Sequence, residues 1–305
     1  MRVFVTGATG FIGGAVAAAC ERAGHEVWGL VRDKNKARRV EEAEIRPVFG
    51  ALDDPASYSA AARDCHVLVH CAAESSARQW DLDRSAIETL LDAARSAGTV
   101  RKVIVTSGVW LYGDTGSQMV DESSPLNPPA PVAQRPGHEQ MVLAANGGRL
   151  QTLVIRPGCV YGGAGSLTGL WFDSAVKEGA ARIVGDGAVR WAMVHIQDLA
   201  DLYVRAAESP WGGEIFNATD RSRFTVLECA RAASLAAGHD GKVATVAVAD
   251  AVKTMGAWAA CLAMTQHVDS RKAVRLLGWQ PRHGGFVDGA QRSFIAWRAH
   301  AGMSS

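Results

Sequence analysis

The chain has 305 residues and a formal net charge of +1, from 32 Lys and Arg against 31 Asp and Glu. Its hydrophobic (48%) and charged (21%) fractions are those of an ordinary globular protein, which excludes disorder as a global description. The balanced charge argues against a nucleic-acid partner, because such domains concentrate Lys and Arg against phosphates.

The cysteines and the N-terminal sequence indicate the cellular compartment of the protein. The six cysteines form no CxxC pair and have no neighbouring His cluster, so we expect neither a metal site nor a disulfide framework. Small buried thiols in a reducing compartment fit better. No signal-peptide pattern opens the sequence, and no stretch approaches the roughly 18 apolar residues of a membrane span. We therefore expect a cytoplasmic protein with no membrane partner. The cysteines are Cys20, Cys65, Cys71, Cys159, Cys229 and Cys261.

Short β-branched runs alternate with helical patterns over the first 160 residues. Most runs are continuously apolar, as in strands buried on both faces. The predicted strands are Arg2–Thr6, Glu26–Val31, Arg46–Phe49, His66–Cys71, Lys102–Thr106 and Thr152–Arg156. The predicted helices are Gly13–Ala23, Pro55–Ala62, Leu82–Ala97 and Gly137–Ala145. This alternation predicts an α/β fold, a doubly wound parallel sheet whose commonest form is a Rossmann-like dinucleotide-binding domain.

The pattern changes after about Arg156. Helices near 167–176 and 198–207, strands near 182–184 and 214–217, and helical stretches 225–237 and 247–263 follow a loop containing Gly162, Gly163 and Gly165. We expect a dinucleotide-binding domain over residues 1–160, with later segments contributing, and mainly a substrate-binding lobe over 161–305. The Pro-rich segment 125–131 should be a surface loop at the strand ends. The apolar stretch 255–264 should be buried in the lobe or against a partner subunit.

The first predicted strand leads directly into a glycine-rich turn and a helix. The segment reads Thr6-Gly7-Ala8-Thr9-Gly10-Phe11-Ile12-Gly13. Gly7 suits the tight turn, Gly10 lets a pyrophosphate approach the backbone, and Gly13 lets the helix pack closely on the strand. Free N–H groups at the helix start then face the anion. Gly7 and Thr9 to Gly13 are therefore the predicted phosphate cradle.

Residues after the second and third strands should select the cofactor. Arg32 comes first after the second strand, where an Arg accommodates the 2′-phosphate of NADP, and Asp33 follows it. We expect NADP to be preferred over NAD; a solvated charge run is the alternative. Leu52 and Asp53 should close over the adenine after the third strand. An N-cap role for Asp53 or Asp54 is an equal alternative.

Further motifs extend over nearly the whole chain. They are Val69-His70-Cys71-Ala72-Ala73, Thr106-Ser107-Gly108-Val109-Trp110-Leu111-Tyr112-Gly113, Arg156-Pro157-Gly158-Cys159-Val160-Tyr161-Gly162, Val194-His195-Ile196-Gln197-Asp198 and Arg275-Leu276-Leu277-Gly278-Trp279-Gln280-Pro281. With the glycine turn they resemble the extended and atypical short-chain dehydrogenase/reductases, which include nucleotide-sugar epimerases and dehydratases. The resemblance implies Ala72 and Ala73 along the ribose–pyrophosphate path and Pro157 beside the nicotinamide. Thr106 and Arg135 complete the expected cofactor contacts, and homodimers are common in this family.

The same resemblance implies a Ser or Thr on the substrate oxygen, a Tyr that exchanges the proton, and a Lys four residues later that lowers the Tyr pKa. In one register those positions are Gly108, Pro131 and Arg135 here, and a shift of one residue puts the Tyr and Lys positions at Val132 and Pro136. Neither register holds a Tyr or a Lys, and the low count of 4 Tyr beside 9 Trp is the compositional trace of this loss. The family's helix Asn is also absent, with Asp83 or Ser85 in its neighbourhood. The chain resembles atypical subgroups that lack the Tyr-xxx-Lys pair.

Other residues must then carry any catalysis. Ser107 can bind a substrate carbonyl, and Arg135 can hold the ribose but cannot exchange a proton. The remaining proton-donor candidates are Tyr112, His138, Tyr161 and His195. Each has a structural alternative: packing for the tyrosines, the helix surface for His138, and a backbone hydrogen bond for His195.

Aromatic residues dominate the expected substrate side, namely Trp80, Trp110, Trp171, Phe172 and Trp191, while Arg182 and Arg190 are the candidates for a diphosphate. An apolar pocket is as plausible as a nucleotide-sugar site, with core packing as the alternative. Three functions stay open. The first is an NADP(H)-dependent oxidoreductase that transfers hydride between nicotinamide and a small carbonyl or alcohol substrate. The others are a catalytically silent NADP-binding sensor or scaffold, and an epimerase- or dehydratase-like enzyme.

Overall fold

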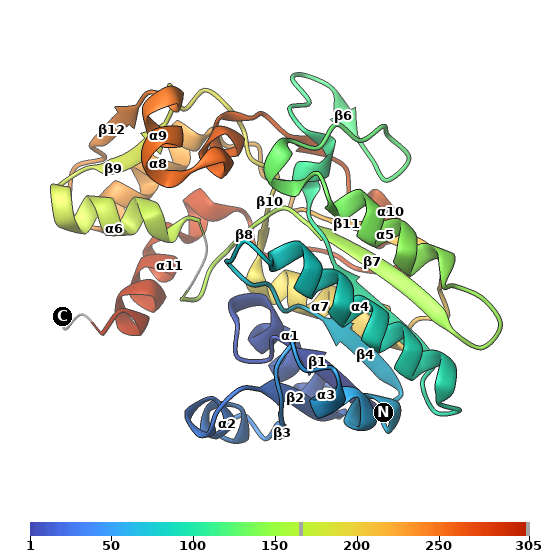
Figure 1. Cartoon of the computed structure of the whole chain (residues 1–305). Coiled ribbons are helices and arrows are strands. Elements are labelled where there is room, and N and C mark those ends of the chain that lie inside the picture. The colour runs from blue at the N-terminus through green and yellow to red at the C-terminus, as the bar shows by residue number, and fades with distance from the viewer. Residues whose placement is uncertain (165–166, 303–305) are drawn as a thin grey trace.

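The computed structural model describes residues 1–164 and 167–302, and a seven-stranded parallel sheet forms its centre (Figure 1). The strand order is β11-β7-β5-β4-β1-β2-β3, and every neighbouring pair is parallel. The strands are β1 (Arg2–Thr6), β2 (Glu26–Val31), β3 (Arg46–Phe49), β4 (Val67–His70), β5 (Lys102–Thr106), β7 (Gln151–Pro157) and β11 (Glu214–Ala218). The doubly wound prediction is confirmed. The order reverses between β1 and β4, which places the ligand crevice at their carboxyl ends.

Helices cover both faces of this sheet. One face carries α1 (Phe11–Arg22), α2 (Lys34–Glu41), α7 (Ile196–Glu208) and α10 (Arg271–Leu277). The other carries α3 (Ala56–Arg63), α4 (Gln79–Ser96) and α5 (Arg135–Ala144). Strand β1 shows why both faces are covered, because its apolar side chains alternate between them. Val3 and Val5 pack into the first layer and Phe4 into the second, and all three are fully buried.

The C-terminal lobe lies at one end of the sheet, where α6, α8, α9, β9 and β12 gather (Figure 1). Its elements are α6 (Gly169–Glu178), β9 (Ala181–Val184), α8 (Val226–Ala236), β12 (Val243–Val246), α9 (Val248–Met255), the 3-10 helix η3 (Ala257–Ala263) and α11 (Phe286–His300). Tyr161, Trp171, Phe172 and Phe286 are buried at its centre. Strand β12 pairs with β9.

Two short parallel pairs and two 3-10 turns connect the sheet to the lobe. The pairs are β8 (Cys159–Tyr161) with β10 (Met193–His195), and β6 (Met119–Val120) with β13 (His267–Val268). The turns are η1 (Val109–Tyr112) and η2 (Ala130–Val132). Among the described residues, no helix is both long and apolar enough to cross a membrane.

Most predicted elements are present, with specific differences. The single helical stretch over 247–263 is wrong, because Gly256 at φ +90° ends α9 and separates it from η3. Within the apolar stretch 255–264, Ala259, Cys261 and Leu262 are buried in the lobe. The segment 125–131 is a loop with one 3-10 turn at its end, as predicted. Helices α2, α10 and α11 were not predicted, and Gly165 lies outside the described residues.

Candidate functional site

The turn between β1 and α1 has the geometry of a phosphate cradle. Gly7 adopts φ +72°, and a Cβ there would lie 2.8 Å from the backbone of Ala72. A Cβ on Gly13 would lie 2.2 Å from the Gly7 carbonyl oxygen. Gly10 is the N-cap and offers no side-chain cap, so N–H groups of the first turn remain for an anion. Gly7 and Gly13 accept only glycine without displacement of the backbone, whereas a Cβ on Gly10 would lie 3.2 Å from the Gly7 carbonyl oxygen. The cradle fits a dinucleotide pyrophosphate.

The segment after β2 carries several exposed cations, of which Arg32 comes first. Arg32 is exposed directly after β2, while the Asp33 side chain caps α2 by accepting from the backbone N–H of Lys36 at 2.9 Å. Asp53 is exposed after β3. The alternative N-cap role for Asp53 or Asp54 is wrong, because α3 begins with no side-chain cap. The Asp33 carboxylate is therefore occupied, whereas the Arg32 guanidinium faces solvent.

Several predicted residues come together in one small cavity at the carboxyl ends of the strands. Leu52, Ala72 and Ala73 line one small cavity with Asp83 and Arg135. Pro157 is buried at the end of β7. Beside α1, Thr9, Gly10 and Phe11 line a separate cavity of about 540 Å³. The structure thus places residues 7–13, Leu52 and Ala72–Ala73 along one edge of the sheet.

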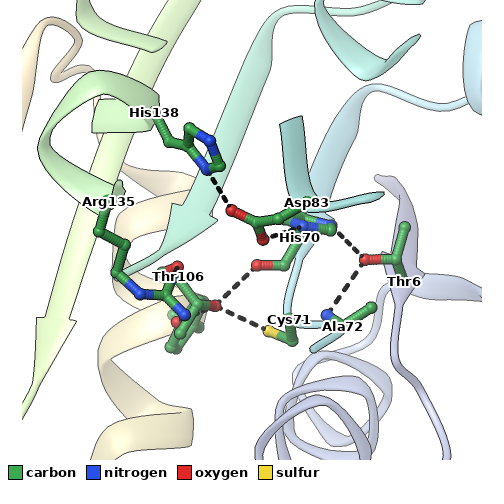
Figure 2. Close-up of polar contacts among 9 residues, drawn as sticks. Thr6, His70, Cys71, Ala72, Asp83, Thr106, Arg135 and His138 are labelled. Carbon is green, nitrogen blue, oxygen red and sulfur yellow. Dashed lines mark hydrogen bonds and ion pairs between the residues drawn. The ribbon is translucent and has the colours of Figure 1, made fainter. Parts of the chain in front are cut away.

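A buried carboxylate joins two histidines at the centre of this edge (Figure 2). Asp83, on α4, lies 3.0 Å from Nε2 of His70 and 2.5 Å from Nδ1 of His138. The exposed fractions are 8% for Asp83, 1% for His70 and 2% for His138. His70 ends β4, and His138 lies on the face of α5 that packs against α4. The interpretation of His138 as a helix-surface residue is therefore wrong.

The network continues from His70 to the phosphate cradle. His70 Nδ1 lies 2.7 Å from Oγ1 of Thr6, and that hydroxyl accepts from the backbone N–H of Ala72 at 3.4 Å. Thr6 is the residue immediately before Gly7. Hydrogen bonds thus connect the glycine turn, the end of β4 and helix α5 (Figure 2).

The charge of Asp83 determines which ring nitrogen atoms of His70 and His138 carry hydrogen toward it. Burial opposes ionisation of Asp83, but hydrogen bonds from His138 and His70 outweigh it and hold the Asp83 pKa well below its ordinary value. Because an ionised carboxylate only accepts, Nδ1 of His138 and Nε2 of His70 both carry hydrogen. Nδ1 of His70 has the Thr6 hydroxyl as its hydrogen-bond partner. Nε2 of His138 makes no hydrogen bond within the described part of the chain, so it is the ring nitrogen left to exchange a proton.

Arg135 is a residue expected at the position of the family's Lys. It donates to the carbonyl oxygen of Thr106 at 3.0 Å, and its guanidinium lies 5.1 Å from the centre of the Trp80 ring. Trp80 in turn packs edge-on against His138, with ring centres 6.0 Å apart. The Thr106 hydroxyl is engaged with Tyr203 at 2.7 Å and with the carbonyl of His70. A fixed cation therefore stands beside the Asp83 network.

Ser107 and Tyr112 have different environments. The Ser107 hydroxyl is buried and has no hydrogen-bond partner in the described residues, although its N–H donates to Ile155 at 2.7 Å. Tyr112 is 3% exposed, donates to Asn217 at 2.9 Å and accepts from Arg156 at 2.8 Å. Burial raises the Tyr112 pKa although the nearby guanidinium opposes the rise. The Ser107 hydroxyl can therefore form a hydrogen bond with a ligand, whereas the Tyr112 hydroxyl already donates one hydrogen bond and accepts another.

His195 and Tyr161 lie outside the Asp83 network. His195 caps α7, where Nδ1 accepts from the N–H of Gln197 at 3.2 Å, as the backbone alternative predicted. Its ring stacks on His283 with centres 3.5 Å apart. Burial and His283 lower the His195 pKa to about 4. Tyr161 is 1% exposed, and burial raises its pKa far above the ordinary value.

Sequence reasoning missed part of this network. From the sequence, Asp83 is only a neighbour of the position where the family has its helix Asn, and His70 is only part of a motif. The available signal was an acidic residue at the Asn position together with a His at a strand end. Neither pattern reveals that α4 and α5 bring Asp83 and His138 into contact.

The chain was compared with known proteins. Residues 3–219 match the sequence model of the family described as NAD dependent epimerase/dehydratase. A relative from Stigmatella aurantiaca, 4-hydroxy-2-methyl-3-oxo-4-farnesyl-3,4-dihydroquinoline-1-oxide ketoreductase, is 31% identical over 91% of this chain and 87% of its own length. The 3-diazoavenalumate denitrifying reductase of a Streptomyces species is 31% identical over 96% of this chain and 100% of its own.

A solved structure has the same fold. It is dTDP-glucose 4,6-dehydratase from Streptomyces venezuelae with NAD and TYD bound, 26% identical with a TM-score of 0.83. The match covers 99% of this chain and 98% of that one. The likeness extends over the lobe as well as the sheet.

Proposed function

The chain belongs to the NAD dependent epimerase/dehydratase family, and from this premise we propose that it is an NADP(H)-dependent oxidoreductase acting on a carbonyl or alcohol carbon. In this proposal His138, held by Asp83, exchanges the proton that the family's Tyr normally carries. Two relatives at 31% identity are named as reductases, which supports reduction over epimerisation.

The chain's own residues account for cofactor binding. The first turn of α1 holds the pyrophosphate with its N–H groups, and Gly7, Gly10 and Gly13 allow the close approach. Arg32 faces solvent after β2 and is available for a 2′-phosphate, whereas Asp33 is used as a cap. This arrangement favours NADP. When bound, the nicotinamide supplies or takes up the hydride.

Arg135 and Ser107 orient the reacting groups. A guanidinium at the Lys position binds ribose hydroxyls and keeps its positive charge at every physiological pH. It also favours charge that develops on a substrate oxygen nearby. The unpaired Ser107 hydroxyl is a donor for that oxygen. A buried hydroxyl without a partner costs about 1–3 kcal/mol, which a bound carbonyl offsets.

The proton step rests on the Asp83–His138 contact, the observation that carries the proposal. The carboxylate fixes the ring through Nδ1 and stabilises the protonated imidazole. In this proposal Nε2 donates to an alkoxide in reduction or accepts from an alcohol in oxidation. Because His138 is 2% exposed, bulk water has little access to this proton.

The test is turnover with a panel of ketones and aldehydes, measured by loss of NADPH absorbance. His138→Gln should lower kcat about 100-fold or more while NADPH affinity is kept. His239→Gln, a half-buried histidine between α8 and β12, is the matched control and should leave the rate unchanged. Full activity in His138→Gln would show that another group supplies the proton. Tight NADPH binding without turnover across the panel would support the sensor instead.

A further inference from the structure

The C-terminal lobe contains a second cavity, separate from the glycine turn, with a volume of about 320 Å³. This volume lies within the range of about 300–1,000 Å³ typical of small-molecule sites. The walls come from α6, β9, β12, α9 and η3. Most of its described lining is apolar, with Trp171, Ile183, Trp191, Val246, Met255 and Leu262 as the large members.

Two tryptophans form a rigid aromatic wall. Trp191 stacks on Trp171 with ring centres 5.1 Å apart and planes 19° apart. The indole N–H of Trp191 donates to the carbonyl oxygen of Leu262 at 3.0 Å. Because this bond uses the polar atom of Trp191, the side chain offers carbon surface to an occupant. Such a wall favours flat or aliphatic groups over hydrated ones.

Charged residues at the cavity are already paired. Arg182 on β9 donates to Glu178 at the end of α6, and Asp173 pairs with Lys177 at 2.8 Å. Arg182 is the one cation among the described lining residues, against two carboxylates, Asp173 and Glu178. Arg190, the other residue expected to meet a diphosphate, instead donates to the backbone of Arg223 and does not line this cavity. A diphosphate would find no unpaired cation on these walls.

The apolar cluster around the cavity includes a residue from the segment that follows β5. Trp110, three residues after Ser107, belongs to the same apolar cluster as Trp191 and Leu262. Pro131, at the family's Tyr position, lies on η2, which packs against η3. Trp110 on η1 and the packing of η2 on η3 thus connect this apolar cluster with the segments that follow β5 and precede α5.

We infer that this cavity binds the apolar part of the substrate, an aromatic ring or hydrocarbon chain attached to the reacting carbonyl, and not a nucleoside diphosphate. The inference rests on the proposed reductase for the identity of the reacting group. It follows from the aromatic wall, the paired charges and the continuity with Trp110.

The test uses a series of alkyl phenyl ketones from acetophenone to hexanophenone. Equilibrium dialysis against the full chain with NADP⁺ present measures affinity without requiring turnover. Each added CH₂ should tighten binding about fourfold until the cavity is full. UDP should not displace hexanophenone. An affinity that is independent of chain length, or displacement of hexanophenone by UDP, would overturn the inference.

Matched variants locate the binding. Leu170 lines the cavity and is 42% exposed, so Leu170→Glu places a charge at its edge with little effect on the fold. We expect a loss of hexanophenone affinity of about tenfold or more. Leu235→Glu changes a 61% exposed leucine on α8 that does not line the cavity, and affinity should be kept. Equal affinities in the two variants would place the ketone elsewhere.

A variant that fills the cavity gives an independent test of where the ketone binds. Ala251 lines the cavity at 1% exposure, and Ala251→Phe should abolish the chain-length dependence while acetophenone still binds. Thermal unfolding checks that this variant folds, and Leu170→Glu carries the test if it does not. Chain-length-dependent binding without turnover would contradict only the reductase proposal. Turnover without chain-length dependence would contradict only the cavity assignment.

Discussion

Nδ1 of His138 lies 2.5 Å from Oδ2 of Asp83, in a place where neither residue is more than 8% exposed. Helices α4 and α5 supply one residue each, and His70 at the end of β4 binds the second carboxylate oxygen at 3.0 Å. A buried carboxylate with two ring donors is stable only in its ionised form. This contact therefore couples stability and proton chemistry.

Acid should destabilise the protein through Asp83. Its folded-state pKa is lowered, so the stabilisation is present above the unfolded-state pKa of about 3.9 and is lost as the pH falls toward the folded-state value. Urea unfolding at several pH values below 5 should show this loss. Asp83→Asn should cost about 3 kcal/mol at neutral pH and flatten that part of the profile. An unchanged acid limb in Asp83→Asn would assign the loss to other carboxylates.

Substitution of Arg32 should separate the two cofactors. Arg32→Ala removes the exposed guanidinium after β2 and should weaken NADPH binding about tenfold or more, with little effect on NADH. Fluorescence titration of both cofactors measures the two affinities. Arg38→Ala, which removes an exposed Arg on α2 paired with Glu42, should change neither. Equal losses for NADPH and NADH in Arg32→Ala would contradict the NADP preference.

Two glycine-to-alanine changes should have opposite effects. Gly13→Ala places a Cβ 2.2 Å from the Gly7 oxygen and should abolish cofactor binding, with a stability loss of about 2 kcal/mol. Gly137→Ala lies in the first turn of α5 with nothing within 4 Å of its Cβ, and should stabilise by about 0.5 kcal/mol. Thermal unfolding with and without NADPH measures both. Retention of NADPH binding by Gly13→Ala would argue against the cradle geometry.

Ser107→Ala should separate stability from activity. The hydroxyl is buried without a partner in the described residues, so its removal should leave stability unchanged or raise it by up to about 1 kcal/mol. The proposed contact with the substrate oxygen predicts a fall in kcat/KM of about tenfold or more. Steady-state kinetics and urea unfolding on one preparation test the pair. A stability loss with normal kinetics would make Ser107 purely structural.

His195 should contribute a second pH dependence. Its folded-state pKa of about 4 lies below the unfolded value of about 6.5, so the unfolded chain binds more protons between these limits. Stability should therefore fall by about 2 kcal/mol as the pH drops from 6.5 to 4. His283, Asp198 and Arg292 are the charged or titratable groups that act on the ring. His195→Asn keeps an N-cap residue and should remove this dependence in urea titrations. A persisting slope would assign it to other groups.

Local sequence determined the sheet and its cradle. Apolar runs specify buried strands through the hydrophobic effect, and Gly7 and Gly13 are required because the backbone leaves no room for a side chain. The sequence likewise indicates that Pro131 and Arg135 stand where the family has its Tyr and Lys.

Only the tertiary structure decided what surrounds these positions. Asp83 and His138 are 55 residues apart and meet because α4 packs on α5. Trp171 and Trp191 meet across the lobe core, with Trp191 held by Leu262. Such pairings depend on how whole elements pack, which no local periodicity or spacing encodes.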